Sequence, residues 1–132
     1  MKSVPTNLRD LLADETRSIA FLATLMPDGS PQLTPVWFNT EGEYLLVNSA
    51  KGRVKDKNMR ARPQVAISIM AMNEMYRYIQ LRGEVIEIDE EGGADHIHAL
   101  SQKYRGRMYD IPAGEIRVTY KIKLDFVSGK KV

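Results

Sequence analysis

One segment near the C-terminus constrains the fold more than any other part of the sequence. Between Ile116 and Phe126, apolar and polar residues alternate without interruption. A period of two places the two sets on opposite faces of a β-strand, so this segment predicts a strand with one buried and one solvated face. Such a strand must pair with other strands in a sheet. The apolar set is Ile116, Val118, Tyr120, Ile122, Leu124 and Phe126, and the polar set is Arg117, Thr119, Lys121, Lys123 and Asp125.

Five other segments have the composition of strands, and short turns separate the first three of them. Pro35 cannot donate to a β-ladder and predicts an edge or a bulge, and Gly83 predicts a second bulge. Three segments have the apolar spacing of helices, but no βαβ unit repeats. The sequence therefore predicts a mainly β fold, a largely antiparallel barrel of six strands. The other strands are predicted at 18–26, 32–39, 44–48, 65–71 and 76–88, and the helices at 6–15, 51–61 and 92–104.

Length and composition limit the class of protein. A chain of 132 residues corresponds to one domain, so we expect a single domain over residues 1–132. No apolar run approaches the roughly 18 residues that a membrane span requires, and no membrane association is expected. The absence of Cys excludes disulfides and thiolate chemistry. With a polar N-terminus, a cytoplasmic location is the default expectation.

Basic residues are concentrated in one stretch. Residues 51–62 contain six basic residues and one acidic residue, whereas the whole chain has a net charge of only +2. The stretch leaves a strand through a Ser/Gly turn and enters a predicted helix, a junction that presents backbone N–H groups to an anion. Two interpretations remain open: an anion-binding site or a solvated helix face. A single basic stretch covers less surface than proteins usually use to bind nucleic acid, so no nucleic-acid partner is expected.

No residue pattern supplies chemistry by itself. His96 and His98 point to different faces of a helix, so no metal site is expected. Phosphate-loop, dinucleotide-binding and nucleophile-elbow motifs are absent from the sequence. Trp37 and Phe38 form either a wall for a planar ring or part of the core and a dimer contact. If the protein is an enzyme, a bound cofactor must provide the reactivity.

Taken in order, several segments resemble the FMN-binding split-barrel superfamily, the pyridoxamine 5'-phosphate oxidase-like proteins. The resemblance is closest to the branch of deazaflavin-dependent (coenzyme F420-dependent) oxidoreductases, and it spans about residues 8–127. The segments that carry it are Ala23-Thr24-Leu25, Asp28-Gly29-Ser30-Pro31, Thr34-Pro35-Val36-Trp37-Phe38, Asn48-Ser49, residues 52–60, Pro63-Gln64-Val65-Ala66, and residues 78–85.

This resemblance implies a six-stranded split barrel that forms a homodimer, with cofactor sites at the interface. The segment 34–38 would line the flavin-type ring, and a polar pair in the third strand would lie beside the ribityl chain and phosphate. The basic stretch would bind the phosphate, and Tyr78 would come from the partner subunit. The implied cofactor-binding residues are Thr34, Pro35, Val36, Trp37, Phe38, Asn48, Ser49, Lys51, Arg53, Lys55, Lys57, Asn58 and Tyr78.

The implied activity is hydride transfer from reduced coenzyme F420 to an unsaturated, planar small molecule. The oligoglutamate tail of F420 needs positive charge beyond the phosphate, which Lys51, Lys57, Arg60 and Arg62 would supply. The short segment after the last strand disfavours vitamin B6 oxidation. The alternatives are an FMN-dependent reductase or oxidase of the same fold and a non-catalytic flavin-binding or deazaflavin-binding protein. No catalytic residue is assigned, although Tyr78 and Tyr109 are candidate proton donors.

Overall fold

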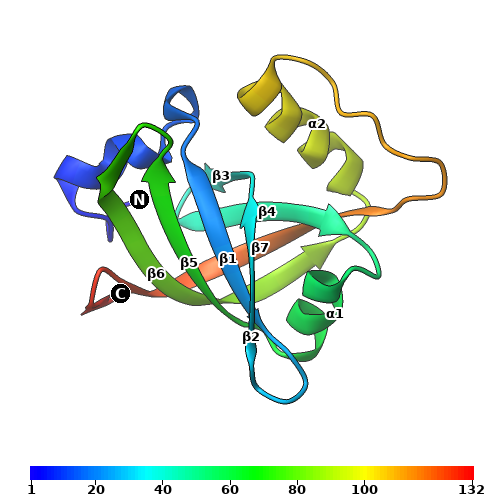
Figure 1. The fold of residues 1–132 in the computed structure, drawn as a ribbon, viewed down its shortest axis with the longest axis horizontal. Coiled ribbons are helices and arrows are strands. Elements are labelled where there is room, and N and C mark those ends of the chain that lie inside the picture. The colour runs from blue at the N-terminus through cyan, green and yellow to red at the C-terminus, as the bar shows by residue number, and fades with distance from the viewer.

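The computed structural model describes all residues from 1 to 132 and contains one curled antiparallel sheet (Figure 1). Neighbouring strands follow the order β2-β1-β5-β6-β7-β4-β3, and a two-residue strand, β8, pairs with β7 outside this order. The expected mainly β, split-barrel class is confirmed. The strands are β1 Ile19–Leu25, β2 Pro31–Val36, β3 Phe38–Glu41, β4 Tyr44–Ala50, β5 Gln64–Ala71, β6 Glu74–Asp89, β7 Arg117–Val127 and β8 Lys130–Lys131.

The predicted number of six strands is wrong, chiefly because the predicted strand 32–39 is two strands. β2 pairs with β1, whereas β3 pairs with β4, and the chain passes from one to the other at Trp37. These two strands are the ends of the sheet, so Trp37 connects the edges of the open barrel. Pro35 therefore lies on an edge strand, where its missing N–H costs no interior ladder bond.

The long strand β6 pairs with β5 on one side and with β7 on the other. Its pairing with β7 shifts register between Arg82 and Gly83, which confirms the predicted bulge. A Cβ atom at Gly83 would overlap the carbonyl oxygen of Lys123, so only glycine permits this close approach of the two backbones. Figure 1 shows that β5 and β6 are strongly curved strands.

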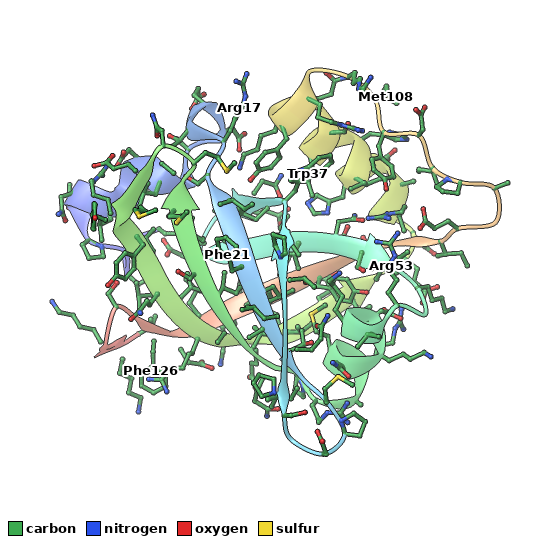
Figure 2. The ribbon with its side chains drawn as sticks, viewed as in Figure 1. Arg17, Phe21, Trp37, Arg53, Met108 and Phe126 are labelled. Carbon is green, nitrogen blue, oxygen red and sulfur yellow. The ribbon has the colours of Figure 1, made fainter.

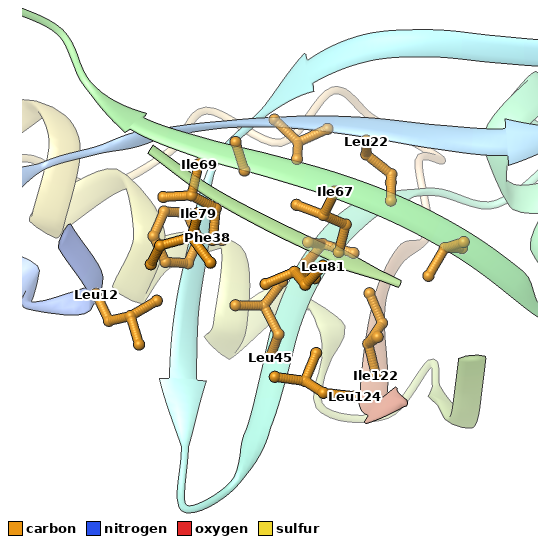
Figure 3. Packing of buried hydrophobic residues seen from close by; sticks show 14 of the residues in the cluster. Leu12, Leu22, Phe38, Leu45, Ile67, Ile69, Ile79, Leu81, Ile122 and Leu124 are labelled. Atoms are coloured by element: carbon orange, nitrogen blue, oxygen red, sulfur yellow. The ribbon is translucent and has the colours of Figure 1, made fainter. Parts of the chain in front are cut away.

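The apolar residues inside the curled sheet form one core of 22 buried residues (Figure 3). The alternating apolar set of β7 contributes Val118, Tyr120, Ile122 and Leu124, all buried as predicted. The other predicted members of that set, Ile116 and Phe126, are not buried.

The N-terminal segment closes one end of the core with Leu11 and Leu12. The expected α-helix at 6–15 is wrong in type, since the segment forms two 3-10 helices, η1 Thr6–Leu12 and η2 Asp14–Thr16. They are seven and three residues long and neither begins with a side-chain cap; short segments of this kind are where 3-10 helices usually occur.

Two α-helices lie at the same side of the barrel, α1 Val54–Ala61 after β4 and α2 Gly93–Arg105 above β4 and β7 (Figure 1). Helix α1 begins three residues later than predicted because residues 51–53 form a turn in which Gly52 has a φ of 94°. A long connection, residues 106–116, leads from α2 to β7. The chain has no helix with the length and apolar character needed to span a bilayer.

Candidate functional site

A cavity of about 380 Å³ lies where α2, the start of α1 and the Trp37 corner meet over β4 and β7. Figure 2 shows Trp37 beneath α2 and Arg53 beside α1, at opposite sides of this region. We call it the α2 cavity. It combines apolar and cationic walls, and its lining residues are Ile19, Pro35, Val36, Trp37, Asn48, Arg53, Lys55, Ile97, Leu100, Tyr109 and Arg117.

The indole of Trp37 forms one wall of the α2 cavity and is held by two tyrosines. The Tyr104 ring stacks on it with centroids 5.4 Å apart, and the Tyr109 ring meets it edge-on at 6.3 Å. The Tyr104 hydroxyl donates to the carbonyl oxygen of Ser18 at 2.6 Å, and burial raises the pKa of this hydroxyl to about 12. Trp37 is thus fixed in orientation beside the unpaired edge of β2.

Three cationic side chains also line the cavity: Arg53, Lys55 and Arg117, which we call the cavity cations. Lys55 makes no ion pair. Its pKa is lowered, first by burial and then by repulsion from Arg53 and Arg117. Three cations that repel one another around one cavity form an environment that an anion would stabilise.

Arg117 is 5% exposed and is held by a chain of polar side chains behind the cavity. Its Nε donates to Oδ1 of Asn48 at 3.0 Å. The Asn48 amide donates to the carbonyl oxygen of Gly93 and to Nδ1 of His96. Nε2 of His96 lies 2.9 Å from Oδ1 of Asn39, so the network assigns the proton to Nε2. Burial lowers the pKa of His96 to about 4, which keeps the imidazole neutral at pH 7.

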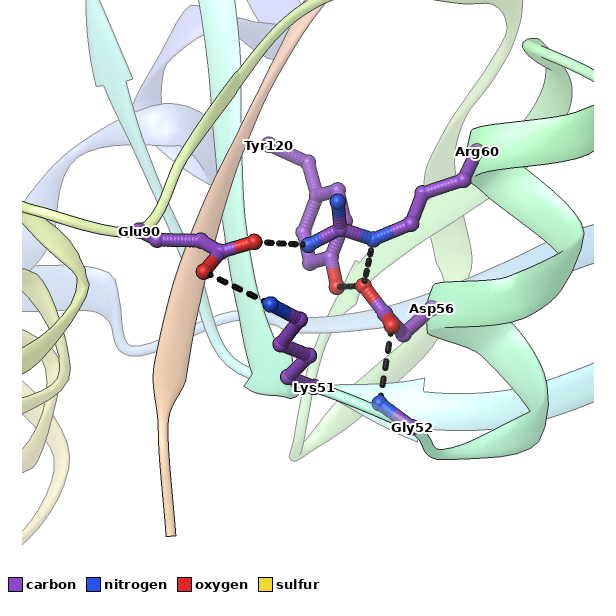
Figure 4. Close-up of polar contacts among 6 residues, drawn as sticks. All are labelled: Lys51, Gly52, Asp56, Arg60, Glu90 and Tyr120. Carbon is purple, nitrogen blue, oxygen red and sulfur yellow. Dashed lines mark hydrogen bonds and ion pairs between the residues drawn. The ribbon is translucent and has the colours of Figure 1, made fainter.

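A second polar network fixes the turn that precedes α1 (Figure 4). Asp56, 2% exposed, accepts hydrogen bonds from the Gly52 amide, the Tyr120 hydroxyl and Nε of Arg60. Burial acts to raise the pKa of Asp56, but these donors outweigh it and hold the pKa below its ordinary value. We call this network the α1 clamp; it comprises Lys51, Gly52, Asp56, Arg60, Glu90 and Tyr120.

Several basic residues of the stretch 51–62 are engaged in holding α1 in place. Glu90 bridges Lys51 at 3.1 Å and Arg60 at 2.8 Å. Arg62 donates to the carbonyl oxygen of Leu25 and to Oδ1 of Asn58. Lys57 is exposed and makes no ion pair, but it does not line the cavity. The extended basic surface expected for a carboxylate tail is therefore smaller than the sequence predicts.

Six of the predicted cofactor-binding residues come together in the α2 cavity: Pro35, Val36, Trp37, Asn48, Arg53 and Lys55. The hydroxyls of Thr34 and Ser49 are buried without hydrogen-bond partners, but neither residue lines the cavity.

The remaining predicted residues lie elsewhere. Phe38 is fully buried in the core. Asn58 is 2% exposed and donates to Oγ1 of Thr24. Tyr78 is on β6, paired with Met70, and is 47% exposed. Of the two candidate proton donors, Tyr109 lines the cavity and Tyr78 does not.

Arg117 is the main lining residue that the sequence did not identify. Alternation placed it on the solvated face of β7, but α2 and residues 106–116 cover that face at its start. This cover comes from segments outside the strand, so the alternation of residues within β7 gives no indication of it. No group of three or more His, Asp or Glu side chains is placed to hold a metal ion.

The family model for pyridoxamine 5'-phosphate oxidase matches residues 5–128. The chain belongs to this family. Among solved structures, a protein named F420 reductase is 31% identical, with a TM-score of 0.83, over 96% of this chain and 99% of that one. The family resemblance, including its deazaflavin branch, is thereby confirmed. No curated protein matches the sequence.

Two solved structures of lower sequence identity share the fold of this protein. A conserved hypothetical protein from Mycobacterium tuberculosis is 22% identical, with a TM-score of 0.66, over 88% of this chain and 78% of that one. HupZ from Group A Streptococcus is 18% identical, with a TM-score of 0.67, over 97% and 98% of the two chains. At these identities the likeness concerns the fold alone.

Proposed function

We propose that this protein is an oxidoreductase that uses coenzyme F420 to reduce an unsaturated, planar small molecule. The observation that carries the proposal is the α2 cavity, in which an aromatic wall and a free strand edge face three cations. A planar, phosphorylated cofactor has the two chemical features that these walls would recognise. Membership of the pyridoxamine 5'-phosphate oxidase family supports a flavin-type or deazaflavin-type cofactor.

The residues present fit such a group. The buried terminal nitrogen Nη1 of Arg117 has no hydrogen-bond partner, and Lys55 has no counter-ion. A buried guanidinium nitrogen without a hydrogen-bond partner and a half-buried ammonium without a counter-ion are both costly, and an oxyanion would remove that cost at both positions. Arg53 and Lys55 would hold the phosphate, and the backbone of residues 34–38 would face the ring.

When bound, the reduced deazaflavin would supply hydride chemistry, which no side chain of this protein can provide. The protein's own contribution is position and exclusion of water. Trp37, Ile97 and Leu100 give the cavity a largely apolar side, which would orient a planar substrate and keep water from the reacting atoms. Tyr109 lines the cavity and is the candidate proton donor.

Coenzyme F420 is favoured over FMN by one observation, the 31% identity to a protein named F420 reductase over nearly the full length of both chains. For the acidic tail of F420, the structure leaves Lys57 available, since Lys51, Arg60 and Arg62 have partners within the protein. FMN is the second candidate, because the family model that matches this chain is that of pyridoxamine 5'-phosphate oxidase.

We further propose that the protein acts as a homodimer. The outer face of the sheet carries an apolar groove of about 710 Å³, in which Phe21, Leu33 and Phe126 take part. Figure 2 shows Phe21 on the outside of β1. The hairpin between β5 and β6 also exposes Met72, Met75, Tyr76 and Tyr78, with Tyr76 90% exposed. A second copy would cover these apolar residues and would bring Tyr78 toward the neighbouring site.

Titration of the purified protein with F420 and with FMN tests the cofactor assignment. We expect micromolar or tighter binding of F420, about −8 kcal/mol, with weaker binding of FMN. Replacing Arg53 and Lys55 together with Ala should weaken F420 binding by about 100-fold or more, since hydrogen bonds to charged groups contribute about 1.5–3 kcal/mol each.

The matched control is the double variant Lys130→Ala/Lys131→Ala. It removes the same charge from exposed residues of β8 that do not line the α2 cavity. Preference for FMN would move the protein to the flavin-dependent branch. Equal losses in the two double variants would mean that the cavity cations attract the ligand only through net charge.

A further inference from the structure

Glu115 is the only carboxylate that contacts the cavity cations. Its Oε1 accepts a hydrogen bond from Nη2 of Arg53 at 3.0 Å and lies 3.6 Å from Nη1 of Arg117. Residues 106–116, which lead from α2 into β7, carry Glu115 to this position. One carboxylate thus lies between two guanidinium groups that line the same cavity.

The contacts of Glu115 are incomplete. Its second oxygen, Oε2, is buried without a hydrogen-bond partner, and so is Nη1 of Arg117. At 3.6 Å, the pair between Oε1 and Nη1 exceeds hydrogen-bond distance. A buried ion pair with an unpaired atom on each side recovers only part of the cost of removing its charges from water. An oxyanion that satisfied both guanidinium groups would therefore replace Glu115 with little loss.

Arg117 is prepared for such a ligand. Its Nε is held by Asn48, whose own amide is fixed by Gly93 and His96, and its guanidinium lies 5.1 Å from the centre of the Tyr109 ring. Nε is thereby engaged, whereas the terminal nitrogen Nη1 has no hydrogen-bond partner. Because Nε is already held, the side chain loses little conformational entropy when its terminal N–H groups bind an oxyanion.

We propose that Arg117 and Arg53 together bind an oxyanion of the ligand, a phosphate or carboxylate group, and that the Glu115 carboxylate competes with it for both guanidinium groups. Arg117 is then a binding residue of this cavity, and Glu115 sets the affinity for anionic ligands. The proposal deepens the proposed function because it concerns the same cavity, but it requires only an anionic group and not a particular cofactor.

The variant Glu115→Gln tests the competition, with Glu90→Gln as its matched control. Glu90 also pairs with two cations, but these are Lys51 and Arg60 of the α1 clamp, neither of which lines the cavity. We expect Glu115→Gln to tighten the binding of inorganic phosphate and of FMN by about fivefold, because the pair of Glu115 with the half-exposed Arg53 contributes no more than a partly screened ion pair. Glu90→Gln should leave both affinities nearly unchanged.

Riboflavin, which lacks the phosphate of FMN, separates this effect from a change in ring binding. Its affinity should be the same for the wild type and for Glu115→Gln. Arg117→Lys should lose at least half of the phosphate-dependent gain of FMN over riboflavin, since an ammonium cannot donate to Asn48 and to an oxyanion in the same geometry. An unchanged FMN-to-riboflavin ratio in both variants would overturn the proposal.

Stability measurements keep the test informative if a variant folds poorly. Removing the Glu115 charge leaves Arg53 and Arg117 without a counter-ion, so phosphate should raise the melting temperature of Glu115→Gln more than that of the wild type. If neither F420 nor FMN binds but phosphate shows this preference, the proposed function fails and the Glu115 proposal stands. If F420 binds the wild type and Glu115→Gln equally, the Glu115 proposal fails and the proposed function stands.

Discussion

The α1 clamp and the cavity cations both draw residues from the turn at residues 51–53 and from α1, yet they use their charges in opposite ways. In the α1 clamp, Lys51 and Arg60 are matched by the carboxylates of Asp56 and Glu90. Among the cavity cations, Arg53 and Arg117 share a single carboxylate, that of Glu115, and Lys55 has none. The first set is balanced and structural, and the second is left with excess positive charge.

This difference supports the proposal that the fold makes an anion site from one part of the basic stretch. The paired charges of the α1 clamp fix the Gly52 turn, so that Arg53 and Lys55 are held where they face the cavity. The unpaired charges of the cavity cations are then available to bind an anionic ligand. Substitutions in the α1 clamp should therefore affect stability, and substitutions among the cavity cations should affect binding.

The largest effect is expected for Asp56→Ala. This change leaves the Gly52 amide, the Tyr120 hydroxyl and the Arg60 side chain without their shared acceptor, and breaking a buried ion pair costs about 3–5 kcal/mol. Urea denaturation should show a loss of about 3 kcal/mol or more in the free energy of unfolding. Arg53→Ala/Lys55→Ala should change it by less than about 1 kcal/mol. Equal losses in both would contradict the division between the two sets.

Acid should weaken the fold through His96, which supports Arg117 from behind. The folded-state pKa is about 4, against an ordinary value of 6.5, so between these values the unfolded chain binds a proton that the folded chain does not. Stability from this group is complete above pH 6.5 and falls as the pH is lowered toward 4. From pH 7 to pH 5 the expected loss is about 2 kcal/mol.

Urea denaturation at the two pH values measures this loss, and His96→Gln provides the control. Because Gln does not titrate, the variant should lose about 2 kcal/mol less than the wild type over the same interval. An NMR titration of the His96 ring gives a second readout, and a pKa near 6.5 in the folded protein would refute the buried, neutral assignment.

The smallest effect on stability, with the opposite sign, is expected for Lys55→Met. Burial and the charges of Arg53 and Arg117 disfavour the Lys55 ammonium, so its removal should raise the free energy of unfolding by up to about 1 kcal/mol. The same change should weaken F420 binding by about tenfold or more, because it removes a charge-assisted contact. Lys57→Met, on the exposed side of α1, should change F420 affinity much less. A loss of stability in Lys55→Met would show that its charge has a partner within the fold.

Much of the fold follows from local patterns in the sequence. The alternation in β7 predicted that Val118, Tyr120, Ile122 and Leu124 are buried, and Gly83 predicted a bulge that the β6–β7 pairing contains. The break at Trp37 could not be predicted in this way, because it depends on β2 and β3 having different partners at opposite ends of the sheet. The point at which the predicted strand 32–39 divides depends on how the whole sheet curls and pairs.

The candidate site was predicted in part, for a related reason. The basic stretch identified Arg53 and Lys55, which line the cavity, but it also included Lys51 and Arg60, whose charges the α1 clamp neutralises. A count of charges does not distinguish these cases, since Glu90 is thirty residues from Arg60 in the sequence. Arg117 was assigned to solvent because strand periodicity gives the face of a residue but not what covers that face.

The most direct test of the central claim is a crystal structure of the protein with F420. The account predicts that the phosphate oxygens lie about 2.7–2.9 Å from nitrogens of the cavity cations, with the ring beside Trp37 and residues 34–36. The Glu115 carboxylate should then have left Arg53 and Arg117. A phosphate bound instead to Lys51 and Arg60 of the α1 clamp, with the α2 cavity unchanged, would contradict the account.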